Sequence, residues 1–518
     1  MNNNPILCLD YPDPDVIRVD DTYYMISTTM YFMPGGVILR SYDLVHWEFA
    51  SYVYDIIEDT QAHRLENGKN IYGKGMWAAS LRYHKGTFYV CFVANEMQTT
   101  YLYQSENITG PWRKQTMEGF YHDCSLFFDE DDRVYIVYGN KKIHLTELES
   151  DLSGPKKNGF DGVIIEDNNA VYLGYEGAHM YKINGKYYVF MIHWIADGTK
   201  RRTEACYVSD SLGGTFTGKD VLNDDMGYLN QGVAQGGIVD TPDGDWYAVL
   251  FQDHGAVGRI PVLVPVHWEN DFPVFGVDGR VPSYINVKST RPDYKYQPLV
   301  GSDEFDYETN EEVIEEIRLK PMWQWNHNPD PNHWNIVKTK NGHALRLING
   351  KLSRNVCEAV NTLTQRMKYP TCAASVKIDA SGIKDGDYAG ICALQGCYGF
   401  IAVTREQEKF YLVMMARKAD STDLKPDHDG TEYGEEYARI HLNSPNVTLK
   451  VCVDFTNMRD EAMFYYKEEN IEQWKQLGIT HKLFFRLDHF TGCRFGLFSY
   501  ATKQLGGIVD FSEFIYEE

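Results

Sequence analysis

The sequence predicts an all-β protein in which a five-bladed β-propeller is followed by a β-sandwich of the jelly-roll, lectin-like type. A strand–turn–strand phrase recurs along the chain before residue 295, and repetition of this kind is typical of propellers. After residue 300 the chain contains alternating strands without the repeat, as a sandwich does. Aromatic residues form 14% of the chain and include 37 tyrosines, which favours strands in both parts.

Each phrase consists of a short apolar strand, a tight turn containing Asp, Asn or Gly, and an aromatic-rich strand. The turn residues tolerate the positive φ of hairpins, and alternation with period two indicates half-buried strands. Hairpins roughly 45–65 residues apart leave room for two outer strands in each blade. An ordinary sandwich with several hairpins is the alternative. The phrases cover residues 15–27, 80–93, 125–139, 180–192 and 237–251.

The composition of the sequence changes around residue 295, where the repeat also ends. Residues 289–312 are polar, contain two prolines and lack the repeat, so we predict a propeller domain over 1–295 and a sandwich domain over 300–518. The second domain again shows alternating segments bounded by turns. These segments are 373–380, 399–406, 409–418, 448–455 and 461–469.

Composition restricts the partners of the chain. The formal net charge of -23 disfavours nucleic acid and anionic lipid, whereas a neutral sugar remains acceptable. No apolar stretch approaches the ~20 residues of a membrane span. The ten cysteines include no CxxC pair, which fits a reducing compartment. Because the N-terminus lacks a signal-peptide pattern, we expect a cytoplasmic or periplasmic location; the oligomeric state stays open, a homo-oligomer included.

A notable side chain precedes the turn of every phrase by about seven residues. If these positions begin the innermost strands of successive blades, their side chains converge on the central channel. Three are carboxylates, and Pro12 and Pro14 hold the first of them in a rigid segment outside regular pairing. The five residues are Asp13, Trp77, Asp123, Glu176 and Gln235.

Three carboxylates around one pit suit the cleavage of a glycosidic bond. Such cleavage needs a proton for the leaving oxygen and a nucleophile at the anomeric carbon, and carboxyl groups supply both. Neighbouring carboxylates also raise one another's pKa, which keeps an acid protonated near neutrality. We predict that Asp13 activates water as the base, that Glu176 is the acid and that Asp123 orients or tunes the acid. Trp77 would lie against the apolar face of the sugar.

The chain resembles glycoside hydrolase family 43, specifically the two-domain members with a C-terminal β-sandwich. The motifs that carry the resemblance are YPDPDVIRVDDTYYMIS, HDCSLFFDEDDRVYIVYG and YEGAHMYKINGKYYVFMI, which contain Asp13, Asp123 and Glu176 in turn. The resemblance implies a five-bladed propeller, an inverting mechanism and pentoside substrates. It also places Arg259 where the family has an arginine that contacts substrate.

The expected substrate-binding residues are Trp77, Arg259, His254, Gln235 and Phe32. Two departures from relatives favour arabinofuranosides over xylosides: Gln235 stands where many have His, and the segment around His254 differs from the pattern of well-studied β-xylosidases. The aromatic loop 323–334 is expected either to brace the sandwich or to close the pit into an exo-acting pocket.

No cofactor is expected to be required and no metal is assigned to the site. Structural calcium remains an option, because hard oxygen ligands suit that ion. In some relatives a calcium lies beside the His that Gln235 replaces. A second candidate set, where the first and last strands of the sandwich would meet, is Asp303, Glu304 and Asp510.

These observations predict an inverting, exo-acting glycoside hydrolase that removes terminal α-L-arabinofuranosyl units from hemicellulose side chains or oligosaccharides. The alternatives are a β-D-xylosidase or dual enzyme acting on xylo-oligosaccharides, a retaining propeller glycosidase, and a non-catalytic carbohydrate-binding protein. The three acids argue against the last, since binding alone does not need them. The source polysaccharide stays open among arabinoxylan, arabinan and decorated xyloglucan.

Overall fold

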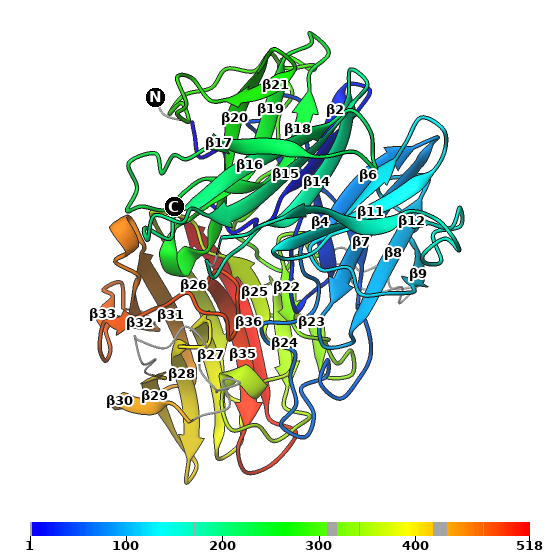
Figure 1. The fold of residues 1–518 in the computed structure, drawn as a ribbon. Helices are drawn as coiled ribbons and strands as arrows, with labels where there is room; N and C mark the ends of the chain where they lie inside the picture. The colour runs from blue at the N-terminus through cyan, green and yellow to red at the C-terminus, as the bar shows by residue number, and fades with distance from the viewer. Residues whose placement is uncertain (1–2, 170, 308–318, 341, 418–432, 470) are drawn as a thin grey trace.

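Five four-stranded antiparallel sheets follow one another along the chain and close into a propeller in the computed structural model (Figure 1). The innermost strands contact one another in a ring, in which the first touches both the second and the fifth. The predicted fold class is therefore confirmed. The structure describes all residues except 1–2, 170, 308–318, 341, 418–432 and 470.

In every blade each strand pairs with the next, with one exception in blade 1, where β3 leaves the sheet. Blade 1 contains β1 (Asp15–Val19), β2 (Thr22–Ser27), β4 (Gly35–Ser41) and β5 (Glu48–Tyr54); blade 2 contains β6 (Ser80–His84), β7 (Thr87–Ala94), β8 (Thr99–Ser105) and β9 (Arg113–Met117). Blade 3 contains β10 (Ser125–Phe128), β11 (Val134–Tyr138), β12 (Lys142–Leu148) and β13 (Asp161–Glu166); blade 4 contains β14 (Glu176–Ile183), β15 (Lys186–Trp194), β16 (Arg202–Ser209) and β17 (Thr217–Leu222). Blade 5 contains β18 (Ala234–Asp240), β19 (Trp246–Asp253), β20 (Arg259–Glu269) and β21 (Phe272–Phe275).

Two large antiparallel sheets form the sandwich, which lies below the propeller in Figure 1. The predicted boundary at 295–300 falls between β21 and β22, where the described residues form no named strand or helix. One sheet contains β3 (Phe32–Met33), β22 (Gln324–Asn326), β25 (Leu363–Arg366), β35 (Arg494–Ala501), β27 (Asp387–Leu394), β28 (Gly399–Glu406), β29 (Lys409–Ala416) and β30 (Glu435–Leu442). The other contains β23 (Trp334–Thr339), β24 (Gly342–Ile348), β36 (Ile508–Glu517), β26 (Thr371–Asp379), β31 (Asn446–Asp454), β32 (Glu461–Glu468) and β33 (Lys475–Gln476), with β34 (His481–Lys482) also paired to β32.

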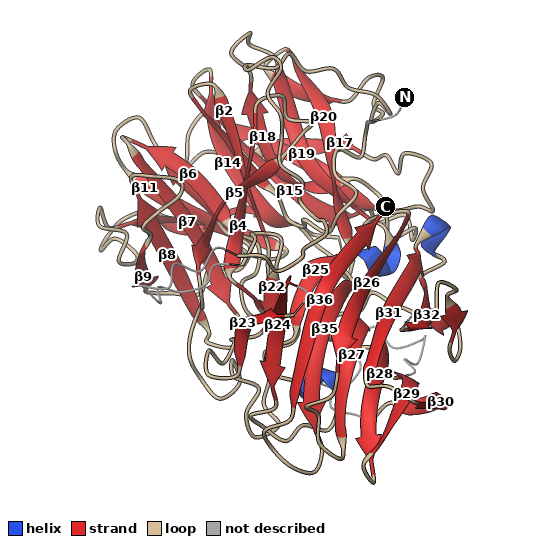
Figure 2. Ribbon diagram, turned by 180° about the vertical axis from the view of Figure 1, so that it is seen from behind, coloured by secondary structure: helices blue, strands red, loops and turns tan. Residues whose placement is uncertain are grey.

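Helical structure is limited, in the described residues, to three short 3-10 turns, which Figure 2 shows in blue among the strands. The turns are η1 (Gly255–Val257), η2 (Val356–Glu358) and η3 (Thr456–Met458). Over the same residues, the search for a helix long and apolar enough to cross a bilayer finds none.

The two domains share one hydrophobic core. A single buried cluster includes Tyr11 and Ile260 of the propeller together with Trp323, Leu363 and Phe495 of the sandwich. The short strand β3 pairs with β22, so the propeller supplies the edge strand of a sandwich sheet. Because this shared cluster is buried, it holds the two domains against each other.

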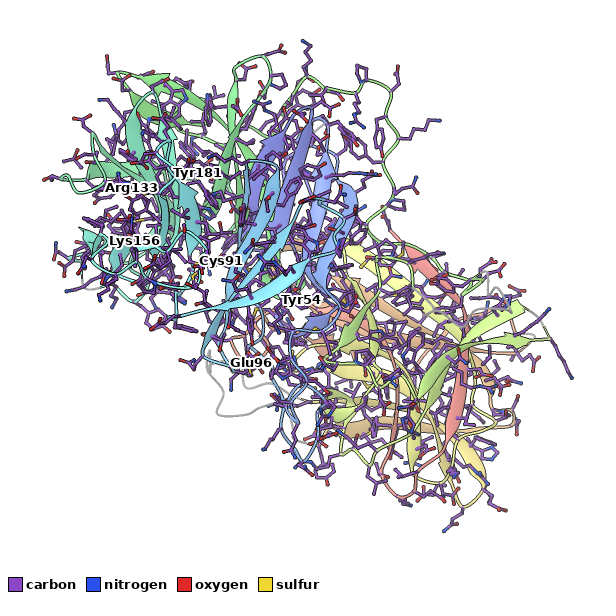
Figure 3. All side chains as sticks on the ribbon, turned by 90° about the vertical axis from the view of Figure 1, so that its right-hand side faces the viewer. Tyr54, Cys91, Glu96, Arg133, Lys156 and Tyr181 are labelled. Atoms are coloured by element: carbon purple, nitrogen blue, oxygen red, sulfur yellow. The ribbon has the colours of Figure 1, made fainter. Side chains whose placement is uncertain are left out.

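The long connection between β5 and β6 also bridges the domains. In Figure 3, Tyr54 and Glu96 lie toward the sandwich, whereas Arg133 and Lys156 lie on the far side of the propeller. Glu96 accepts the backbone N–H of Gly75 at 2.7 Å and lies 3.2 Å from the ring of His63, so it holds this connection in place. The backbone carbonyl of His63 in turn accepts the N–H of Asn328 of the sandwich.

Candidate active site

The three predicted carboxylates stand at the starts of innermost strands. Asp13 and Asp123 each lie two residues before β1 and β10, and Glu176 is the first residue of β14. Asp13 and Asp123 have positive φ values of 52° and 46°. Residues other than glycine adopt this backbone conformation uncommonly, and the surrounding structure holds them in it. The charges of Asp13 and Glu176 both act on Asp123. The structure thus brings the three acids together at the ring of inner strands.

Asp13 is held by two donors. The Thr28 hydroxyl donates to one carboxylate oxygen at 2.8 Å, and the Arg259 guanidinium donates to the other at 2.8 Å. Arg259 begins β20 in blade 5, next to blade 1 in the ring. Asp10 fixes this arginine by accepting its backbone N–H at 2.8 Å. These bonds hold Asp13 in one orientation and leave it charge-compensated.

A local irregularity in blade 4 positions Glu176. The register of β14 against β15 shifts between Glu176 and His179, and Gly177 takes φ +62°. A Cβ at position 177 would lie 2.8 Å from the side chain of Gln235, so only glycine fits there. The amide of Asn140, from blade 3, donates to the Glu176 carboxylate. The sequence motif therefore encodes both the acid and the bulge that aims it.

Asp123 carries the raised pKa of the site. The residue is 7% exposed, and one carboxylate oxygen is buried without a hydrogen-bond partner. Burial and the charges of Glu176 and Asp13 raise the pKa of Asp123 to about 7, against the opposing charges of His122 and Arg259. Asp123 can therefore retain a proton near neutrality.

His122 bridges two of the acids. Its Nε2 atom lies 3.7 Å from a carboxylate oxygen of Asp123 and 3.7 Å from one of Glu176. The charge of Asp123 is the main cause that raises the pKa of His122 to about 9, with Glu176 adding and burial opposing. His122 was not among the residues predicted from the sequence; its position directly before Asp123 was the available signal.

An aromatic side chain of the sandwich, Phe490, lies beside the site, and we refer to it as the lid. The ring centroid of Phe490 lies 4.6 Å from the Arg259 guanidinium and 5.6 Å from the ring of Trp77. The ring of Trp77 is also 5.7 Å from that of His122, which places it beside the acids. Gly492, near Phe490, donates its N–H to Asp10, so the same carboxylate anchors Arg259 and the lid. Sequence reasoning missed Phe490, because nothing local marks its loop.

Arg202, also missed, adds a second guanidinium. It begins β16, forms an ion pair with Asp253, and lies 5.6 Å from the ring centroid of Phe251. Arg259 lies on the same ring at 5.4 Å. Burial and the neighbouring Arg259 lower the pKa of Arg202 to about 10, while the charges of Glu176 and Asp13 oppose this. The site is therefore flanked by two arginines.

The remaining predicted contacts lie at different places. Gln235 borders Gly177 and donates its backbone N–H to Glu204, so it belongs to the site wall. His254 is buried, bonded to Gln252 and stacked on Tyr228 at 4.2 Å. Phe32 lies in the domain interface, where Arg494 is 3.5 Å from its ring centroid. The structure does not bring His254 or Phe32 to the carboxylates, and their substrate contacts remain predictions.

The aromatic loop 323–334 braces the sandwich. Trp325 and Trp334 contact each other at 4.9 Å, and Trp323 contacts Phe514 at 4.8 Å. The ring that contacts Arg259 and Trp77 is that of Phe490, which lies outside this loop, and closure of the site by the loop stays a prediction.

Two of the three acids proposed for calcium, Asp303 and Asp510, already have protein partners. Asp303 accepts from the indole of Trp323 at 2.8 Å and lies 2.9 Å from the Lys320 ammonium. Asp510 forms a two-point ion pair with Arg346. These partners do not fit a calcium site, and structural calcium remains a prediction.

One group in the described part of the chain has metal-binding geometry. Donor atoms of His122, Asp123 and Glu176 lie within 4.8 Å of one another. Asp123 and Glu176 are two of the acids that the sequence predicts to act in bond cleavage, and the contacts of the three residues are those described above. We assign no metal to them.

Carboxylates converging from three blades, with two arginines and aromatic walls, define a glycoside hydrolase with a propeller fold. Comparison with known proteins agrees. Residues 2–273 match the sequence pattern described as "Glycosyl hydrolases family 43", and residues 315–517 match the "Beta xylosidase C-terminal Concanavalin A-like domain". The chain belongs to glycoside hydrolase family 43.

Three relatives illustrate the similarity. A "Beta-xylosidase" of Formosa agariphila is 28% identical, over 99% of this chain and 90% of that protein. A "Non-reducing end alpha-L-arabinofuranosidase" of Bacteroides ovatus is 27% identical, over 75% of this chain and 72% of that protein. The solved structure of a "Bifunctional GH43-CE" protein of Bacteroides eggerthii is 41% identical with a TM-score of 0.89; the match covers 99% of this chain but only 63% of that protein.

Proposed function

We propose that this enzyme is an inverting, exo-acting α-L-arabinofuranosidase that removes terminal units from hemicellulose side chains or oligosaccharides. The observation that carries the proposal is the convergence of Asp13, Asp123 and Glu176 beside Arg259, whose guanidinium contacts the ring of Phe490. We infer that this ring closes one side of the site. A pit closed on one side accepts the end of a chain more readily than its middle. Two arginines and a tryptophan supply donors and an apolar wall for one sugar ring.

In this mechanism Asp13 is the base. Its bonds to Thr28 and Arg259 orient the carboxylate toward water on one face of the sugar. Glu176 donates the proton to the leaving oxygen. Asp123 retains its own proton near neutrality and, with His122, sets the charge around the acid. The water attacks as the bond breaks, which inverts the anomeric centre.

A β-D-xylosidase is the second candidate. The observations that favour it are the xylosidase name of the Formosa relative, aligned over 99% of this chain, and the match of residues 315–517 to a β-xylosidase C-terminal domain. The arabinofuranosidase name of the Bacteroides ovatus relative supports the first candidate. Both activities use the same acids on a terminal pentosyl unit and differ in the ring that the pocket accepts.

Side-by-side kinetics on nitrophenyl α-L-arabinofuranoside and nitrophenyl β-D-xyloside test the specificity. We expect kcat/KM to be at least ten times higher for the arabinofuranoside; a preference of that size for the xyloside would contradict the proposal. Glu176→Gln and Asp13→Asn should each lower kcat by about 10²–10⁴, the usual contribution of a positioned acid or base. Lys288→Gln, at an exposed ion pair on the propeller surface, is the matched control.

The stereochemical course is a separate test. Proton NMR of the first-formed sugar should show the anomer opposite to that of the substrate. Retention would reject Asp13 as a base acting through water and would make it a direct nucleophile.

We further infer that the enzyme acts on an oligosaccharide or polysaccharide, in the cytoplasm or the periplasm. All ten cysteines are free, and the sulfur atoms of Cys91 and Cys124 lie 3.8 Å apart without a bond.

A further inference from the structure

An aromatic pair stands on blade 4 beside the site and takes no part in the mechanism above. The rings of Tyr172 and Trp194 lie 5.7 Å apart at an interplanar angle of 35°. Tyr172 is 66% exposed, so its ring contributes little to the buried core. Trp194 is half-buried beside Tyr172. An exposed aromatic side chain beside a functional site, as Tyr172 is, is a candidate for ligand contact.

The backbone ties this pair to the catalytic residues. Trp194 is the last residue of β15 and donates its N–H to the carbonyl of Leu173 at 3.0 Å. Tyr172 precedes Leu173, and Glu176 follows three residues later. Leu173 packs on the small buried cluster that contains Phe251. The ring platform and the proposed acid therefore belong to the same short, anchored segment.

The pairing of β15 with β16 places Trp194 next to a residue of the candidate active site. Trp194 is directly opposite Arg202 in β16, and residues directly opposite each other project to the same face of a sheet. Arg202 lies on the ring of Phe251, which also carries Arg259, and Arg259 donates to Asp13. The aromatic pair therefore lies one strand away from Arg202, which shares the Phe251 ring with the arginine that holds the proposed base.

We infer that Tyr172 and Trp194 form the platform for the leaving-group sugar, a xylopyranosyl residue of a hemicellulose backbone. The inference rests on the proposed function, because it assigns a partner ring to the unit cleaved between Asp13 and Glu176. An all-equatorial xylopyranose ring presents flat C–H faces that stack well on aromatic rings, whereas the puckered furanose rings of arabinan fit less well. Arabinofuranosidase and xylosidase activity on xylan fragments both leave such a ring.

The test compares two substrates that share the cleaved unit and differ in the leaving group. They are an arabinose-substituted xylo-oligosaccharide and methyl α-L-arabinofuranoside, or xylotriose and methyl β-D-xyloside if the enzyme prefers xylosides. In Tyr172→Ala and Trp194→Ala we expect KM for the oligosaccharide to rise about tenfold, equivalent to ~1.4 kcal/mol. kcat should stay within about twofold, because stacking is lost equally from the bound and transition states.

Matched variants separate stacking from structure. Tyr172→Phe and Trp194→Phe keep a ring and should stay within about threefold of the parent KM. Tyr284→Ala removes an exposed tyrosine (58%) elsewhere on the propeller and should change nothing. Since Tyr172 is largely exposed, Tyr172→Ala should fold even if Trp194→Ala does not.

Direct binding distinguishes failure of the platform from failure of the proposed function. Titration calorimetry with unsubstituted xylohexaose needs no hydrolysis. If the parent cleaves no pentoside but both alanine variants bind xylohexaose about tenfold more weakly, the platform stands and the proposed function falls. Unchanged KM and unchanged binding in both alanine variants would overturn the platform. So would an equal loss on the methyl glycoside, which would mean that the pair only braces Glu176, or a parent that binds arabinan fragments and not xylohexaose.

Discussion

At the scale of single residues, the buried acids of the site differ in the charged groups that surround them. Asp13 is paired with Arg259, whereas Asp123 has an unpartnered buried oxygen and two carboxylates nearby. The pKa of Asp123, about 7, lies well above the value of about 3.9 for an exposed Asp. The Asp123 carboxyl can therefore keep its proton near neutral pH, beside the two other acids of the site.

This raised pKa predicts a pH-dependent stability. Folded Asp123 keeps its proton up to about pH 7, but the unfolded chain loses it above about pH 4, so the free energy of unfolding falls as pH rises through that window. Asp123→Asn removes this titrating group and with it the fall in the free energy of unfolding. It also removes the main charge that raises the pKa of His122. We expect the stability of the variant relative to the parent to increase by about 1–2 kcal/mol from pH 5 to pH 8.

Urea unfolding at the two pH values measures this change. Asp210→Asn, at a side chain that is 89% exposed, is the control and should show no such trend. A constant difference between the Asp123 variant and the parent at pH 5 and pH 8 would contradict the burial argument.

At the scale of elements, the irregular start of β14 decides where Glu176 points. Gly177→Ala would place a methyl group 2.8 Å from Gln235 in a backbone conformation with φ +62°. We expect kcat to fall about 10²-fold, as a displacement near 1 Å of a catalytic group does. Gly185→Ala is a matched control, because Gly185 also has positive φ (+78°) but nothing within 4 Å of its would-be Cβ. Equal losses of activity in both variants would show that backbone strain alone is responsible.

A second prediction at this scale concerns the loop that carries Phe490. Phe490→Ala removes the ring from the Arg259 guanidinium and from Trp77. We expect kcat/KM to fall about three- to thirtyfold, in line with a cation–π contact of ~0.5–2 kcal/mol. Phe410→Ala, which removes a ring 5.9 Å from Arg405 in the sandwich, should leave the kinetics unchanged. If the two variants behave alike, Phe490 does not close the site.

At the scale of the whole molecule, the sandwich is part of the catalytic unit. It shares the main hydrophobic cluster with the propeller, pairs with β3 and supplies Phe490. Figure 1 shows the two domains in contact along this boundary.

A propeller truncated to residues 1–295 should therefore fail to form a soluble monomer, since it would expose the shared cluster and the edge of β3. Soluble yield and size-exclusion chromatography, with the full chain alongside, measure this. A monomeric truncation that unfolds cooperatively would mean that the interface only docks two independent domains.

The sequence by itself determined the five-bladed ring and the repeat phase of Asp13, Asp123 and Glu176. Turn residues and period-two alternation act within a few residues, so they can be read directly from the chain. Only the tertiary structure decided that Phe490, Arg202 and His122 adjoin these acids, that Phe32 lies in the domain interface, and that β3 belongs to the sandwich. Those contacts join segments far apart in the chain or depend on where a side chain finally points. Packing of the whole molecule selects them, and no local pattern records that choice.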